Sequence, residues 1–233
     1  MSFDRSIANL LEYRRTRFPL ARFLPLALFL GLAASTADEH TSVGFFAVRV
    51  LLVFLWLFQF RLGDDLADRQ RDRRDHPDRV LVRAEGRPFA WLLAILTAGN
   101  MLMTYWQLSV SRSTEFIGLV GLFLLWYGIM RCWHFPLLTS VGVLLKYPAF
   151  VYLLSDPSES VSRSTMIEVV VLVYACVLTH EFLHEKRLWR MSGISIYLAL
   201  SMLLMTAAAV WLMRLNAQGS QEWWLFGALG MGC

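Results

Sequence analysis

The sequence predicts an all-α protein: a polytopic transmembrane bundle of about seven (seven to eight) helices, forming one domain over residues 1–233. Three observations support this. Hydrophobic residues make up 57% of the chain, the mean hydropathy is +0.49 and 17% of residues are charged, whereas soluble domains are about half apolar and about a quarter charged. Apolar stretches near the ~20 residues that cross a bilayer recur along the chain. Basic residues gather in alternate connections between those stretches.

Seven apolar stretches have about the length of a transmembrane helix. They are Pro19–Ala37, Val43–Phe60, Pro88–Val110, Phe116–Met130, Phe135–Leu154, Thr165–Leu183 and Ile194–Met213. An eighth stretch, Trp223–Cys233, is too short to cross the bilayer and is predicted to be interfacial or re-entrant. The first stretch follows several arginines and leads to no small-residue cleavage site, so we expect no cleavable signal peptide.

The basic residues predict the orientation of the chain in the membrane. One set of alternate segments holds 17 of the 22 Lys and Arg residues, and the opposite loops hold only Arg112, Arg163 and Arg214. The positive-inside rule then places the N-terminus and the connections at about 61–87 and 184–192 in the cytoplasm. In a bacterium, the membrane would be the inner membrane. The net charge of +4 therefore indicates orientation, and neither nucleic acid nor a protein partner is predicted.

A stripe of three aspartates follows the second apolar stretch. Asp64, Asp68 and Asp72 are four residues apart, and helical residues at that spacing differ by ~40° in direction and ~6 Å in rise. Like charges at this spacing repel one another, and Mg²⁺ prefers oxygen ligands that it shares with substrate phosphates. This aspartate stripe predicts a metal–diphosphate site; the alternative is a solvated loop that serves only topology. Pro77 predicts that the helix ends near His76.

A second acidic pair ends the sixth stretch. Glu181 and Glu185 are four residues apart, and the loop pattern puts them on the same side of the membrane as the aspartate stripe. The same segment, His180–Glu181–Phe182–Leu183–His184, is also a literal H-E-x-x-H pattern, which is typical of zinc metalloproteases. Such a site needs a third protein ligand, and no histidine follows His184. A further alternative is that these side chains are solvated at the interface.

Two cations lie inside apolar stretches. Lys146 is midway along the fifth stretch, where an ionisable group is costly and is a functional candidate by default. It is predicted to contact a diphosphate or a carboxylate, with an ion pair between helices as the alternative. Arg49 is nearer the outer end of its stretch, and a structural pairing is the better hypothesis.

The two acidic motifs resemble those of the UbiA superfamily of intramembrane prenyltransferases. The run Asp64–Asp72, followed by His76–Pro77–Asp78–Arg79, is similar to the first aspartate-rich motif of that family, although Asp64 stands where asparagine is commoner. Glu181 and Glu185 resemble the second motif, usually D-x-x-x-D. Members of the family typically have nine spans, so this chain resembles a shortened branch.

The resemblance implies an activity and roles for individual residues. We expect a prenyl diphosphate and a small acceptor as substrates, with Mg²⁺ as the cofactor. Asp64, Asp68 and Asp72 would bind one metal ion and Glu181 with Glu185 another. The residues expected to bind the diphosphate are Asp64, Arg69, Arg79 and Lys146. Asp68, Asp72 and Lys146 are the expected catalytic residues. A terpene cyclase with the same acidic residues, the zinc metalloprotease and a non-enzymatic membrane scaffold remain as alternatives.

Overall fold

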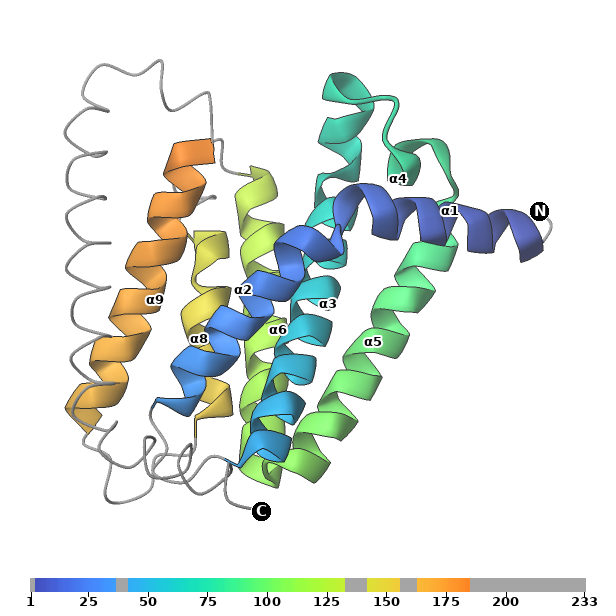
Figure 1. Cartoon of the computed structure of the whole chain (residues 1–233). Helices are drawn as coiled ribbons and strands as arrows, with labels where there is room; N and C mark the ends of the chain where they lie inside the picture. Colours follow the sequence, from blue (N-terminus) through green and yellow to red (C-terminus); the bar gives the residue numbers. More distant parts are fainter. Residues whose placement is uncertain (1–2, 37–41, 133–141, 156–162, 185–233) are drawn as a thin grey trace, which may run out of the picture. The chain divides into compact units, whose positions relative to one another are not determined.

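The structure of the chain is a computed structural model that describes residues 3–36, 42–132, 142–155 and 163–184 (Figure 1). Every regular element in those residues is an α-helix, which confirms the all-α prediction for the described part of the chain. The chain divides into two compact units. Met1–Leu32 and His40–Phe135 form the first, and Ala33–Glu39 with Pro136–Cys233 form the second.

The first unit contains most of the described helices. In chain order they are α1 (Phe3–Arg17), α2 (Leu20–Ser35, whose last three residues belong to the second unit), α3 (Val43–Asp75), α4 (Val80–Arg83), α5 (Gly86–Gln107) and α6 (Val110–Cys132). Consecutive long helices pack against one another, α3 against α5 and α5 against α6. The Ser42 side chain accepts a hydrogen bond from the backbone amide of Phe45 and so caps the start of α3.

α1 and α2 are separated by a sharp bend. Their axes differ by 65° across a break at Phe18 and Pro19, because the residue before a proline is disfavoured in the helical conformation. Phe18 is buried at the bend, and its ring packs on Phe54 and Phe58 of α3 with centroid distances of 5.1 and 4.9 Å. The predicted first stretch, Pro19–Ala37, therefore corresponds to α2.

Two described helices are long and apolar enough to cross a membrane. They are α3 and α5, and the bent pair α1–α2 would make three. α5 exposes large apolar side chains along one face, including Trp91, Ile95, Leu102 and Trp106, as expected of a helix that faces lipid rather than water. The described residues thus contain two to three candidate spans, and the predicted count of seven to eight stays a prediction.

The second unit contains α8 (Lys146–Leu154) and α9 (Arg163–His184), which pack against each other. Their buried side chains include Phe150, Val151 and Val173. α8 is the end of the predicted span Phe135–Leu154, and α9 covers all of the predicted span Thr165–Leu183. The stretches Ile194–Met213 and Trp223–Cys233 lie outside the described residues.

Candidate functional site at the charged end of α3

The aspartate stripe lies on a continuous helix. α3 extends beyond its apolar half, Val43–Phe60, and carries Asp64, Asp68 and Asp72 on its next turns. It ends at Asp75, where the backbone amide of His76 donates to the carbonyl of Asp72 at 2.8 Å. The helix therefore ends where Pro77 predicted, and the first part of the 61–87 connection is helical.

The three aspartates of the stripe differ in burial. Asp72 is buried, whereas Asp64 and Asp68 are half-buried. The reason is geometric, because steps of four residues on a helix turn by ~40° each, so a stripe of three winds from one face towards another. The face of α3 directed at the protein carries Leu62, Asp65 and Asp72 instead.

Asp65 is the centre of a buried hydrogen-bond network. Its carboxylate accepts a hydrogen bond from the Tyr13 hydroxyl at 2.9 Å and two from the Arg17 guanidinium at 3.0 and 2.5 Å. Arg61, one turn earlier on α3, lies 3.3 Å away. The Asp65 side chain is only 7% exposed. This network fixes α1 against α3, since a buried carboxylate is tolerated only when it is paired and hydrogen-bonded.

Asp65 also determines the protonation of its partners. Burial, and then the negative charge of Asp65, raise the pKa of the Tyr13 hydroxyl above its ordinary value. Burial opposes the charge of Arg17, but the hydrogen bond and the attraction of Asp65 outweigh it and raise the pKa of Arg17. Both groups therefore stay protonated and remain donors to the carboxylate.

The segment after α3 folds back onto it through two arginines. Arg79 pairs with the buried Asp72 at 2.5 Å. Arg69 donates from Nε to the carbonyl of Leu81 at 2.8 Å and from Nη2 to the carbonyl of Ala84 at 2.7 Å, and so binds the carbonyl end of α4. Arg69 and Arg79, both predicted to contact the diphosphate, are thus engaged by the protein itself.

Gly86 lies directly against the Arg69 guanidinium. A Cβ atom at this position would lie 2.4 Å from Nη1 of Arg69, closer than any side chain allows without movement of the guanidinium. The apolar side chains of Tyr13, Leu62, Val80, Leu81 and Phe89 form a buried core beneath these polar contacts. The connection between α3 and α5 is therefore anchored by both packing and hydrogen bonds.

Asp68 is far more exposed than Asp72, the other carboxylate of the stripe whose ion pair the structure describes. Its side chain is 45% exposed and pairs with Arg71, itself 63% exposed, at 2.6 Å. Partial burial raises the pKa of Asp68; Arg71 opposes this, and Asp72, Asp64 and Asp65 add to it. The crowded negative charge at Asp68 is the condition that a bound cation would relieve.

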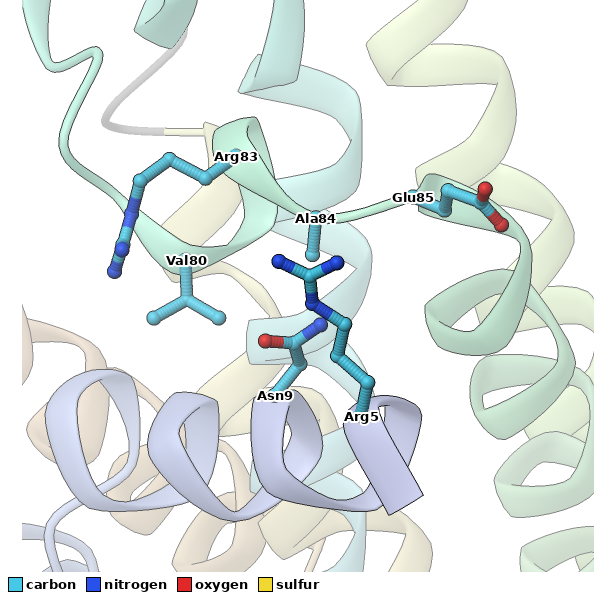
Figure 2. A pocket seen from close by; sticks show the side chains of 6 residues that line it. All are labelled: Arg5, Asn9, Val80, Arg83, Ala84 and Glu85. Carbon is cyan, nitrogen blue, oxygen red and sulfur yellow. The ribbon is translucent and has the colours of Figure 1, made fainter. Parts of the chain in front are cut away.

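A small cavity lies between α1 and α4. Its volume is about 240 Å³, and it is lined by Arg5, Asn9, Val80, Arg83, Ala84 and Glu85. Figure 2 shows Arg5 and Asn9 projecting from α1 towards Ala84. None of the predicted site residues lines this cavity, so it is separate from the stripe.

The remaining predicted site residues lie in the second unit. Lys146 is buried at the start of α8, with Nζ 5.6 Å from the centroid of the Tyr147 ring. The backbone of α9 reaches His184, so the H-E-x-x-H segment lies on one helix. The side chains of His180, Glu181 and His184, and all of Glu185, lie outside the described residues. The predicted convergence of both acidic motifs stays a prediction.

Sequence reasoning missed Asp65, Tyr13 and Arg17. The signal was present, because Phe58, Leu62, Asp65 and Asp72 follow one another at intervals of three, four or seven residues and so share the inward face of a helix. The spacing of four residues pointed instead to Asp64, Asp68 and Asp72, which wind around α3. The pairing of Asp65 with α1 was not readable from spacing alone.

The donor set of the stripe fits Mg²⁺ in its chemistry, since it consists of carboxylate oxygens. Within the part of the chain that the structure describes, no three His, Cys, Asp or Glu side chains form a group that could hold a metal ion. Comparisons with known protein families, curated proteins and solved structures found no match. The residues of this chain are therefore the basis for its proposed function.

Proposed function

We propose that the protein is an Mg²⁺-dependent intramembrane prenyltransferase, which transfers an isoprenyl group from a prenyl diphosphate to a small acceptor such as an aromatic ring. The observation that supports this most directly is Asp68, half-buried among other carboxylates at the end of an apolar helix. A prenyl diphosphate has a strongly anionic head and an apolar tail. The carboxylates at the charged end of α3 would bind the head through a metal ion, and the apolar half of the same helix would lie beside the tail.

The orientation of the chain is part of the proposal. The basic segments 3–17 and 61–87 lie at the same end of the first unit, since Arg17 contacts Asp65 and Arg83 pairs with Glu12 at 2.8 Å. The positive-inside rule then favours a cytoplasmic location for this end. The stripe would therefore face the compartment that supplies the diphosphate and Mg²⁺.

Each predicted residue has a role in this proposal. Asp64, Asp68 and Asp72 would bind one Mg²⁺ ion, and Glu181 with Glu185 would bind a second. Bound Mg²⁺ would offset the negative charge that develops on the departing diphosphate. When Asp72 turns to the metal ion, Arg79 would lose its ion pair with Asp72 and bind the diphosphate instead. Arg69 would mainly hold in place the connection that carries Arg79. Lys146 would contact the diphosphate.

The reaction is a substitution at an allylic carbon. The bond between that carbon and the diphosphate oxygen breaks, and the diphosphate leaves with the electron pair. The acceptor donates electrons to the allylic cation and then loses a proton. Apolar side chains around the reacting carbon would keep water from competing with the acceptor.

The test is incubation of the purified full chain with geranyl, farnesyl and geranylgeranyl diphosphates and Mg²⁺. Diphosphate release is measured, and products are identified by mass spectrometry. Asp68→Asn should reduce diphosphate release on the order of 100-fold, because it removes a ligand of the Mg²⁺ ion that would stabilise the charge of the leaving diphosphate. Asp75→Asn, at an exposed residue on the last turn of α3, is the matched control. Full activity in both Asp68→Asn and Asp72→Asn would reject the proposal.

The same assay separates the alternatives. A cyclic hydrocarbon or alcohol formed from a prenyl diphosphate alone would identify a terpene cyclase instead. Bound zinc that is lost in His180→Ala, together with no release of diphosphate, would favour the metalloprotease. Absence of both Mg²⁺-dependent diphosphate binding and zinc would favour a scaffold.

A further inference from the structure

One face of α1 is apolar and exposed, although other sides of the helix contact the rest of the first unit. Ile7 and Leu11 are 41% and 55% exposed. Tyr13 is buried against α3 and α5, where its hydroxyl binds Asp65 and its ring lies 5.5 Å from that of Phe89. On another side, Glu12 pairs with Arg83. The exposed apolar face therefore needs an explanation of its own.

Two arginines, Arg14 and Arg15, lie on the same side of α1 as this apolar face. Ile7 and Leu11 are four residues apart and lie on the same side of α1, whereas Leu11 and Tyr13, two apart, point in nearly opposite directions. Arg14 and Arg15 follow Leu11 by three and four residues, so they extend the same side by one turn. Arg15 is exposed and Arg14 is half-buried. The face combines apolar side chains with positive charge at one end.

The position of α1 relative to α2 points to the same partner. α2 exposes Leu20, Leu24, Leu28 and Leu32 at intervals of four residues, as a lipid-facing stripe would. The two axes differ by 65°. Since spans usually tilt by only ~20° from the membrane normal, a transmembrane α2 leaves α1 closer to the membrane plane than to the normal.

We propose that α1 is an in-plane interfacial helix that binds anionic phospholipid. Ile7 and Leu11 enter the boundary between headgroups and acyl chains, and Arg14 with Arg15 bind the headgroup phosphates. Amphipathic helices with basic residues beside their apolar face bind anionic membrane surfaces in this way. α2, which is separated from α1 by two residues, exposes its own leucine stripe, and a lipid surface can cover both apolar faces without a protein partner. This inference does not depend on the catalytic proposal.

The first test measures what covers Leu11. In the full-length protein with Cys132, Cys176 and Cys233 replaced by serine, a nitroxide label is attached at Leu11→Cys or, as a matched position one residue further on, at Glu12→Cys. After reconstitution in bilayers, collisions with oxygen, which partitions into lipid, and with a water-soluble nickel chelate are compared. The label at Leu11 should collide several-fold less with the chelate than the label at Glu12, and more with oxygen.

Two results would overturn the proposal. Equal access of the nickel chelate to both labels would mean that the face is in water. Shielding of the Leu11 label from both reagents would mean that protein covers it, as in a dimer of this chain. The Glu12→Cys variant breaks only a pair between exposed side chains, so the fold is expected to persist in both labelled proteins.

The second test addresses the phosphate contacts. The depth of the Leu11 label is measured in vesicles of phosphatidylcholine alone and mixed with phosphatidylglycerol. The anionic lipid should draw the label deeper, with less effect at high salt because surface charges are screened. Arg14→Gln/Arg15→Gln should lose this dependence on lipid charge. Arg73→Gln/Arg74→Gln, an exposed adjacent pair on the last turn of α3, should retain it. No dependence in the unaltered chain, or equal loss in both double variants, would contradict the role of Arg14 and Arg15.

Discussion

The two halves of α3 are held in place by different interactions. In the apolar half, Trp56 stacks on Phe116 of α6 at 5.0 Å, and Gln59 accepts a hydrogen bond from Asn100 of α5 at 2.6 Å. In the charged half, Asp65 and Asp72 are bound by arginines from α1 and from the segment after α3. Packing dominates in the apolar half, whereas paired charges determine the position of the chain in the charged half.

This difference predicts that the charged half is the more sensitive to a single polar substitution. The largest effect is expected for Asp65→Asn, which leaves Arg17 and Arg61 without their shared carboxylate in a mostly buried site. Removal of one partner of a buried pair costs about 3–5 kcal/mol, and the free energy of unfolding should fall by about 3 kcal/mol since Arg17 is partly exposed. Thermal or denaturant unfolding in detergent measures it.

The control for this prediction is Asp75→Asn, which removes a carboxylate from an exposed residue on the same helix. Its unfolding free energy should change by no more than about 0.5 kcal/mol. Similar stability for the two variants would show that the network around Asp65 does not hold α1 against α3, and the comparison between the halves of α3 would fail.

Much of the fold was predictable because hydrophobic length and proline positions are local signals. The apolar stretches gave the approximate bounds of α2, α5, α6 and α9, and Pro77 gave the end of α3 within two residues. The second apolar stretch ends at Phe60, and the helix continues without interruption through the aspartate stripe to Asp75, as predicted. Helical backbone does not end where hydrophobicity ends, and no breaker occurs before Pro77.

The candidate site was less predictable because it depends on contacts between distant segments. Asp65 is bound by Tyr13 and Arg17, about fifty residues earlier in the chain. Arg69 was predicted to contact a diphosphate, but its guanidinium binds the carbonyls of Leu81 and Ala84. A basic residue in a charged loop has the same local signature whether it binds a ligand or a helix end.

A smaller effect is expected in the apolar half. The hydrogen bond between Gln59 and Asn100 is buried between two candidate spans. Such bonds contribute on average about 0.6 kcal/mol and at most about 1.7 kcal/mol in membrane proteins. A double-mutant cycle with Gln59→Leu and Asn100→Leu should give a coupling energy in this range. A coupling energy as large as the loss in Asp65→Asn would contradict the contrast between the two halves.

The smallest change in the free energy of unfolding is expected for Asp68→Asn, and this substitution should stabilise the protein rather than destabilise it. Because the folded protein raises the pKa of Asp68 above the ordinary value of 3.8, the folded state binds this proton more tightly than the unfolded chain does. The stabilising contribution is full below pH ~4 and is lost as pH rises through the folded pKa. Asp68→Asn should therefore be slightly more stable than the unaltered chain at pH 7, and the gain should vanish near pH 3.

Solvent screening limits this gain, since the Asp68 side chain is 45% exposed and its pairing with Arg71 is exposed as well. We expect roughly a few tenths of a kcal/mol, measurable as a difference between unfolding curves recorded at the two pH values. Addition of Mg²⁺ with a prenyl diphosphate should reverse the order, because ligand binding stabilises only a protein that retains the carboxylate. If Asp68→Asn stayed the more stable protein in the presence of both ligands, Asp68 would not bind the metal ion. The aspartate stripe would then have a purely topological role.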